Sequence, residues 1–126
     1  MQSAFLEHVN VTVSDPDRTA AMLTDLFGWH ERWRGAAKDA GLSIHVGGDD
    51  FYLVVYSRPD VRPNAGDPGG LVGGLNHVGV VVDDLDAVEA RVVAAGFKPH
   101  SHADYEPGRR FYFDDADGIE FEVVAY

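Results

Sequence analysis

Two stretches of sequence decide the fold: residues 7–17 read EHVNVTVSDPD, and residues 76–86 read NHVGVVVDDLD. They are offset by 69 residues and are identical at six of eleven positions, among them the pair His8 and His77. In both stretches valine alternates with other residues, which is typical of a half-buried β-strand. The sequence therefore predicts a duplicated module that begins with a strand.

Each predicted strand is followed by a helical pattern. Asp15 begins the first helix and Gly28 ends it, while Asp84 begins the second and Gly96 stands just past its end. Three further strands are expected in each half, roughly over residues 29–34, 42–46 and 51–56, and over residues 98–103, 109–113 and 119–125. Each half is thus predicted to be β-α-β-β-β, which places the chain in the α+β class.

The two halves are expected to form a single domain over residues 1–126, with one module at about 4–57 and the other at about 75–126. Residues 58–74 between them are rich in glycine and proline and are long for a loop inside a compact domain. A linker of this length allows the modules to pair within one chain or to swap between two chains.

Composition excludes several classes of function. The 126 residues include 10 Lys and Arg against 21 Asp and Glu, a formal charge of −11, so the basic surface that nucleic acids require is missing. There is no cysteine, which removes disulfides, thiolate metal sites and cysteine nucleophiles. No apolar run of membrane-spanning length occurs, and we expect a cytoplasmic protein without a membrane partner.

Strand alternation places the polar residues of the repeat on one face. His8 and Asn10 share one face of their strand, and the valines lie on the opposite face, which we expect to pack against the helix. His77 takes the equivalent position in the second half. The same parity puts Glu120 and Glu122 on that face of the last strand. Two imidazoles and a carboxylate at equivalent strand positions form a candidate metal triad of His8, His77 and Glu122.

A simpler interpretation is that each histidine is a partly exposed or hydrogen-bonded strand residue without a metal. Glu120 is open to a similar explanation, because Arg109 or Arg110 could pair with it at the rim of the sheet. The closing strands also correspond: residues 48–54 match residues 118–124, which makes Tyr52 the counterpart of Glu122.

Taken together, residues 7–13, residues 76–80 and the ending FYFDDADGIEFE at residues 111–122 resemble the vicinal oxygen chelate superfamily, also called the glyoxalase/bleomycin resistance/dioxygenase proteins. The resemblance covers nearly the whole chain, and Ala116 replaces a usual proline. It implies two paired β-α-β-β-β modules whose curved sheets enclose a metal and a small substrate, with Glu122 as a metal ligand. It also implies a homodimer, in which the ligands can come from both subunits.

The resemblance separates some activities from others. Glyoxalase I and methylmalonyl-CoA epimerase have Glu or Gln where this chain has Tyr52, and a neutral phenol is a poor ligand. Two histidines and one glutamate are instead similar to the pattern of extradiol dioxygenases and fosfomycin-resistance thiol transferases. In both, a tyrosine ten residues before the ligand lines the pocket, and Tyr112 stands at that position here, although it could also simply pack within its aromatic strand. His102 stands one residue too far from it for the extradiol pattern, and Arg110 is the nearest substitute for a phosphonate-binding residue.

The resemblance therefore implies an enzyme with one divalent metal ion, Fe, Mn, Ni, Co or Zn, acting on a small substrate through two vicinal oxygens. The reaction stays open between lyase, isomerase, transferase and ring-cleaving dioxygenase. The candidate site residues divide by role: Tyr112, Tyr52 and His45 as catalytic groups, and Asn10, Arg110 and Glu120 as substrate-binding groups.

Two alternatives stay open. The chain could be a metal-free binding protein of the bleomycin-resistance type, whose acidic groove sequesters a cationic small molecule, with aromatic residues such as Trp33 packing in the core or stacking on a planar ligand. It could also be a protein that only pairs with a partner and keeps the triad as a relic.

Overall fold

The computed structural model describes residues 3–126. The chain divides into two compact units, with the boundary between Arg62 and Pro63. The division falls inside the glycine- and proline-rich segment that the sequence marks as a linker. Each unit carries one four-stranded sheet and one α-helix of its own, in the predicted order β-α-β-β-β.

Unit 1 forms its sheet in the order β1-β4-β3-β2, with β1 parallel to β4 and the other pairs antiparallel. A parallel pair needs a long crossover, and the helix supplies it. The elements of unit 1 are β1 His8–Thr12, α1 Pro16–Phe27, β2 His30–Ala37, the 3₁₀ turn η1 Lys38–Ala40, β3 Gly41–Gly47 and β4 Tyr52–Ser57.

Unit 2 repeats this topology in the order β5-β8-β7-β6, with β5 parallel to β8. Its elements are the 3₁₀ turn η2 Pro68–Gly70, β5 Val78–Val81, α2 Leu85–Ala94, β6 His100–Tyr105, β7 Gly108–Asp114 and β8 Glu120–Ala125. β5 is shorter than the repeat predicts: β1 begins at His8, whereas β5 begins at Val78, one residue after the equivalent His77.

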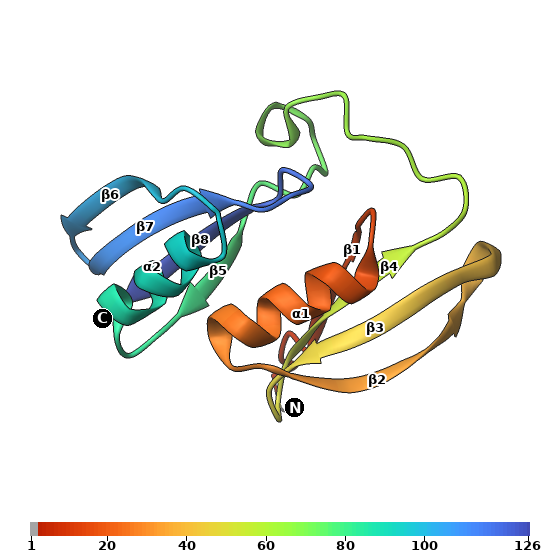
Figure 1. Cartoon of the computed structure of the whole chain (residues 1–126), viewed down its shortest axis with the longest axis horizontal. Coiled ribbons are helices and arrows are strands. Elements are labelled where there is room, and N and C mark those ends of the chain that lie inside the picture. The colour runs from red at the N-terminus through yellow and green to blue at the C-terminus, as the bar shows by residue number, and fades with distance from the viewer. Residues whose placement is uncertain (1–2) are drawn as a thin grey trace. The chain divides into compact units, whose positions relative to one another are not determined.

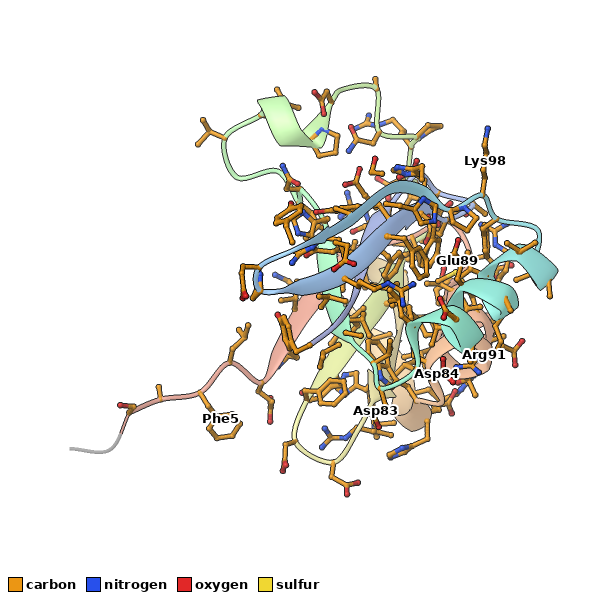
Figure 2. All side chains as sticks on the ribbon, turned by 90° about the vertical axis from the view of Figure 1, so that its left-hand side faces the viewer. Phe5, Asp83, Asp84, Glu89, Arg91 and Lys98 are labelled. Atoms are coloured by element: carbon orange, nitrogen blue, oxygen red, sulfur yellow. The ribbon has the colours of Figure 1, made fainter. Side chains whose placement is uncertain are left out.

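Capping residues set the helix boundaries where the sequence predicts them. The side chain of Asp15 accepts a hydrogen bond from the backbone N–H of Arg18 at 3.2 Å, and Asp84 accepts one from Ala87 at 3.0 Å. α1 ends at Gly28, whose φ of 70° lies in the left-handed region that glycine adopts without strain. Asp83 and Asp84 are labelled at the start of α2 in Figure 2.

In each unit the helix covers one face of the sheet (Figure 1). The core lies between the helix and that face, and its fully buried side chains are Leu23, Leu26, Ile44, Val46 and Val55 in unit 1 and Val92, Phe111, Phe113, Phe121 and Val123 in unit 2. Burying each such side chain contributes about 1.5–3 kcal/mol. The other face of each sheet is free of helix and carries the polar side chains considered next.

A β-bulge in β6 changes which residues share a face. His100 pairs with Tyr112 and Ala103 pairs with Arg110, so between these two pairs β6 advances by three residues and β7 by two. Ser101, inside the bulge, has a φ of 54°. As a result His100 lies beside Tyr112 on the helix-free face, whereas His102 contacts Glu89 of α2 at 2.7 Å on the other face. Glu89 is labelled on α2 in Figure 2.

Candidate functional site

Most of the predicted site residues, together with two residues that were not predicted, fall into two clusters, one on the helix-free face of each sheet. The unit 1 cluster contains Glu7, His8, His45 and Tyr52, and the unit 2 cluster contains Asn76, His77, Arg110, Tyr112 and Glu122. We describe each cluster within its own unit.

Glu7 organises the unit 1 cluster. One of its carboxylate oxygens, Oε1, accepts hydrogen bonds from Nδ1 of His8 at 2.9 Å and from the hydroxyl of Tyr52 at 3.1 Å. The bond from His8, and after it the bond from Tyr52, lowers the pKa of Glu7. Since an ionised carboxylate only accepts, His8 carries a proton on Nδ1, and in the neutral imidazole Nε2 presents a lone pair.

The ring of Tyr52 lies between two imidazoles. It stacks on His8 with ring centroids 4.9 Å apart and on His45 with centroids 4.6 Å apart. Partial burial, and then the bond to Glu7, raises the pKa of Tyr52, so this phenol is a proton donor at neutral pH. Burial, followed by the charges of His8 and Arg32, lowers the pKa of His45, which keeps that imidazole neutral.

Glu122 is the centre of the unit 2 cluster. Its side chain is only 14% exposed, and its Oε2 accepts hydrogen bonds from Nη1 of Arg110 at 2.8 Å and from the hydroxyl of Tyr112 at 2.9 Å. Burial by itself raises the pKa of this carboxyl, but the bonds from Tyr112 and Arg110 and the charge of Arg110 outweigh burial, and the pKa lies below its ordinary value. The same bond to Glu122 raises the pKa of Tyr112.

His77 faces the second oxygen of Glu122. Its Nε2 lies 3.4 Å from Oε1 of Glu122, and its Nδ1 lies 2.7 Å from Oδ1 of Asn76. An amide oxygen accepts and cannot donate, so Nδ1 of His77 carries a proton, and in the neutral imidazole Nε2 presents a lone pair toward the carboxylate. In that form the two acceptor atoms, Nε2 of His77 and Oε1 of Glu122, favour a cation between them.

These two atoms fit a metal ion by their chemistry. An imidazole nitrogen and a carboxylate oxygen are ligands that Fe, Mn, Co, Ni and Zn accept. The other nitrogen of His77 and the other oxygen of Glu122 already have hydrogen-bond partners, which orient the two ligands. Within residues 3–126 no group of three or more His, Cys, Asp or Glu side chains is gathered closely enough to hold a metal. Unit 2 by itself therefore offers two protein ligands.

The sequence missed Glu7 and Asn76. Both stand directly before the histidines of the repeat and hold Nδ1 of the following imidazole with a side-chain oxygen. The signal was present in the aligned stretches, because each first position carries a residue with an acceptor oxygen. Comparing the side-chain chemistry at each aligned position, rather than counting identical residues, would have found this shared acceptor.

The strand registers overturn the equivalence of Tyr52 with Glu122. Tyr52 lies opposite His8 across β4 and β1, whereas Glu122 lies opposite Gly79, two residues beyond His77. The two turns that precede β4 and β8 differ in length. A shift of two residues keeps every side chain on its face, so the alternation in the sequence could not detect it.

The position in unit 1 that corresponds to Glu122 is therefore held by Val54, which lies opposite Asn10. A valine offers no ligand atom. The counterpart of Tyr52 in unit 2 is Glu120, at the first position of β8.

The remaining predicted residues are placed as follows. Arg110 bonds to Glu122, and Arg109 bonds to Asp86 of α2 at 2.8 Å, so neither arginine makes the predicted pair with Glu120. Asn10 lines a hollow on the helix-free face of unit 1. His102, considered for the extradiol pattern, is removed from the cluster by the bulge, and His100 takes the place beside Tyr112 with ring centroids 6.2 Å apart.

Comparison with known proteins identifies the family. The family model of the Glyoxalase/Bleomycin resistance protein/Dioxygenase superfamily matches residues 5–123, and the chain belongs to this superfamily. No curated protein matches the chain. Among residues 3–126 we find no helix with the length and apolar character needed to cross a membrane.

Solved structures share the fold. A glyoxylase/bleomycin resistance protein/dioxygenase domain from Frankia sp. EAN1pec is 24% identical, with a TM-score of 0.83 and 98% of each chain covered. TnmS3, an antibiotic binding protein from Streptomyces sp. CB03234, is 19% identical, with a TM-score of 0.75 and coverage of 99% of this chain and 98% of that one.

A third similar structure contains a metal. It is a mutant of the fosfomycin resistance protein FosX from Listeria monocytogenes, complexed with Mn(II) and 1S,2S-dihydroxypropylphosphonic acid. It is 19% identical, with a TM-score of 0.72 and coverage of 98% of this chain and 93% of that one. At these identities the likeness establishes the shared fold.

Proposed function

We propose that this chain is a divalent-metal-dependent enzyme that acts on a small substrate carrying two vicinal oxygens. One observation carries the proposal: in both halves a side-chain oxygen of the residue before the repeated histidine contacts Nδ1, which leaves Nε2 of the neutral imidazole to coordinate a metal, and in unit 2 Nε2 lies 3.4 Å from Oε1 of Glu122. Histidines that bind metals are commonly oriented in this way by a partner on the other nitrogen.

In this proposal His77 and Glu122 hold the metal, and His8 supplies a third ligand. A bound divalent metal supplies Lewis acidity to the substrate oxygens. The structure of FosX with Mn(II) supports the assignment of a divalent metal within this fold.

The chain's own residues orient the site. Tyr112 and Arg110 hold Oε2 of Glu122 and thereby direct Oε1 toward Nε2 of His77. The raised pKa of Tyr112 keeps its hydroxyl protonated at neutral pH, so it can donate to a substrate oxygen when it releases Glu122. His45, which its surroundings keep neutral, can accept a proton at a ring nitrogen, and Tyr52 can orient the substrate.

The experiment is to measure metal content by inductively coupled plasma mass spectrometry on protein purified without a histidine tag. We expect about one metal per chain, lost in His8→Ala, His77→Ala and Glu122→Ala. His102→Ala is the matched control, because His102 bonds to Glu89 on the helical face. A wild-type chain that stays empty after exposure to Fe(II), Mn(II), Ni(II) and Zn(II) contradicts the proposal.

The residues that hold Nδ1 give a second test. Asn76→Leu removes the acceptor of His77 and is expected to weaken Mn(II) binding by about 10- to 100-fold, as for other partners of metal-bound histidines. Asn76→Asp keeps an acceptor oxygen and should bind Mn(II) at least as well as the wild type. Electron paramagnetic resonance of free Mn(II) measures both, and equal affinity in all three proteins contradicts the assigned role of Asn76.

A second candidate function is metal-free sequestration of a cationic small molecule. The formal charge of −11 favours it, and TnmS3, a structure of the same fold, is an antibiotic binding protein. Calorimetric binding of a cationic antibiotic to metal-depleted wild type, unchanged in His77→Ala, would support this candidate over the first.

The homodimer and the cytoplasmic location expected from the sequence belong to the same proposal. The dimer is tested by light scattering during size-exclusion chromatography, where a mass of about 13.7 kDa, that of one chain, would contradict it.

A further inference from the structure

A buried arginine occupies one oxygen of Glu122. Nη1 of Arg110 donates to Oε2 of Glu122 at 2.8 Å, and the two side chains are only 11% and 14% exposed. The hydroxyl of Tyr112 donates to the same oxygen at 2.9 Å. Since a carboxylate oxygen has two lone pairs, these two bonds use those of Oε2. Glu122 therefore has only Oε1 to offer to a metal.

Regular strand pairing brings the arginine to this carboxylate. Tyr112 of β7 pairs with Glu122 of β8, and Arg110 pairs with Val124, two residues further along β8. Arg110 and Tyr112 thus lie on one face of β7, with Glu122 as the diagonal neighbour of Arg110. A long side chain can reach a diagonal neighbour in an antiparallel pair, so the contact follows from the register.

Two further contacts hold the guanidinium in place. Nη2 of Arg110 donates to the backbone oxygen of Gly108 at 3.2 Å, and Cζ lies 4.9 Å from the ring centroid of Tyr105. Nε of Arg110 is shielded from solvent and has no hydrogen-bond partner among residues 3–126. A guanidinium covered in this way leaves little surface for a substrate, and its charge acts mainly on Glu122.

The arginine offsets the charge that would attract a metal to unit 2. Glu122 is ionised, whereas neutral His77 contributes no charge. Arg110 adds one positive charge, and the bond to Glu122 raises the pKa of Arg110, which keeps the guanidinium protonated. Salt screens charges in a partly buried site only weakly, so a divalent cation at Oε1 would be repelled by Arg110.

We propose that Arg110 is a built-in counter-charge of the metal site, which lowers the affinity for divalent cations and limits Glu122 to one coordinating oxygen. The inference rests on the proposed function, because it concerns the metal assigned there. In this role Arg110 acts on a metal ligand, whereas the sequence predicted that it binds substrate. The same contact that aims Oε1 at His77 also weakens the attraction of Oε1 for a cation.

The test measures Mn(II) affinity of the full-length protein at pH 7 by electron paramagnetic resonance of free Mn(II). Arg110→Gln keeps a donor near Glu122 without the charge and is expected to bind at least about tenfold more tightly, the order of effect of removing one nearby like charge. Arg110→Lys keeps the charge and should bind like the wild type. Arg109→Gln is the matched control, since it removes the same charge from the neighbouring residue, which bonds to Asp86 of α2.

A gain in affinity separates this role from a structural one, because damage to the fold would weaken binding. Combining Arg110→Gln with Glu122→Gln should abolish the gain, since the gain depends on the carboxylate. Arg110→Met removes the charge without supplying a donor and is also expected to bind more tightly than the wild type. The test therefore does not depend on the folding of one variant.

The outcomes distinguish this inference from the proposed function. If the wild type binds Mn(II) and neither Arg110→Gln nor Arg110→Met binds more tightly, the inference is overturned and the metal-dependent function stands. If Arg110→Gln binds Mn(II) and the wild type does not, the inference is supported and the metal-dependent function is overturned. Absence of binding in both proteins overturns both.

Discussion

At the residue scale, Glu122 is a charge kept ionised in a mostly buried position. Burial opposes ionisation, and hydrogen bonds from Tyr112 and Arg110 more than compensate for it. The folded-state pKa of Glu122 is therefore lower than the ordinary value of 4.5. A carboxyl group with a lowered folded-state pKa stabilises the fold above its unfolded-state pKa, and that stability is lost as the pH falls through the folded-state value.

We predict that Glu122→Gln is less stable than the wild type by about 1–2 kcal/mol at pH 7, because the charge-assisted bond to Arg110 is lost. The difference should shrink as the pH falls below about 4.5, where the carboxyl of the unfolded chain takes up a proton, and it should be lost once the pH has fallen through the lower folded-state pKa. Urea denaturation of metal-depleted protein at pH 7, 5 and 3 measures it. Glu120→Gln is the control, and a difference that stays constant with pH would contradict the ionised state of Glu122.

At the scale of elements, left-handed backbone at non-glycine residues occurs in one turn and one bulge among the described residues. Asp39 and Ala40, in the turn between β2 and β3, both have a φ of 59°, and Ser101 in the β6 bulge has a φ of 54°. This left-handed conformation costs about 1–2 kcal/mol for an ordinary residue. The turn at Asp39 also borders the hollow of unit 1.

Ala40→Gly is therefore expected to stabilise the chain by about 0.5–1 kcal/mol, because glycine adopts the left-handed conformation without a Cβ clash. The same substitution at Ala21, an exposed position within α1, should destabilise it by about 1 kcal/mol. Chemical denaturation of the two variants tests for opposite signs. A loss of stability in both would show that the turn carries no strain at Ala40.

The elements also show how far sequence reasoning reaches. Repeated valines and capping residues such as Asp15 and Asp84 predicted the two modules and both helices, since these signals are local. The bulge in β6 was not predictable, because it shows only in the pairing of β6 with β7 and no glycine or proline in β6 marks it. Its effect is to separate His100 from His102, two residues that a regular strand would place on one face.

At the same scale, the site was predicted in part. His77, Tyr112 and Glu122 share one face of unit 2 as the alternation predicted, and His45 shares one with Tyr52 in unit 1. The pairing of Tyr52 with Glu122 as equivalents was wrong, since register depends on turn length. The metal and catalytic roles of these residues stay predictions.

At the scale of the whole molecule, the charge of −11 is spread over 126 residues. Net charge of this size destabilises a compact chain by self-repulsion, and salt screens that repulsion. We predict that the melting temperature at pH 7 rises with sodium chloride concentration.

A triple variant with Asp49→Asn, Asp50→Asn and Asp83→Asn, three exposed positions, should respond less steeply to salt than the wild type. Thermal denaturation followed by circular dichroism measures both proteins. A melting temperature that falls with salt in the wild type would mean that attractive ion pairs, such as Arg34 with Asp17 at 2.9 Å, outweigh the repulsion.

The bond from each repeated histidine to the residue before it has an evolutionary consequence. Glu7 and Asn76 belong to the same short segment as the imidazole they hold, so the device that orients each histidine is portable: any duplication that copies the opening strand copies the orientation with it. The two halves then differ by one unit of charge, since Glu7 is an acid and Asn76 an amide, but in both it is Nδ1 of the histidine that is held. A duplicated module could in this way diverge in the basicity of its histidine while inheriting its geometry.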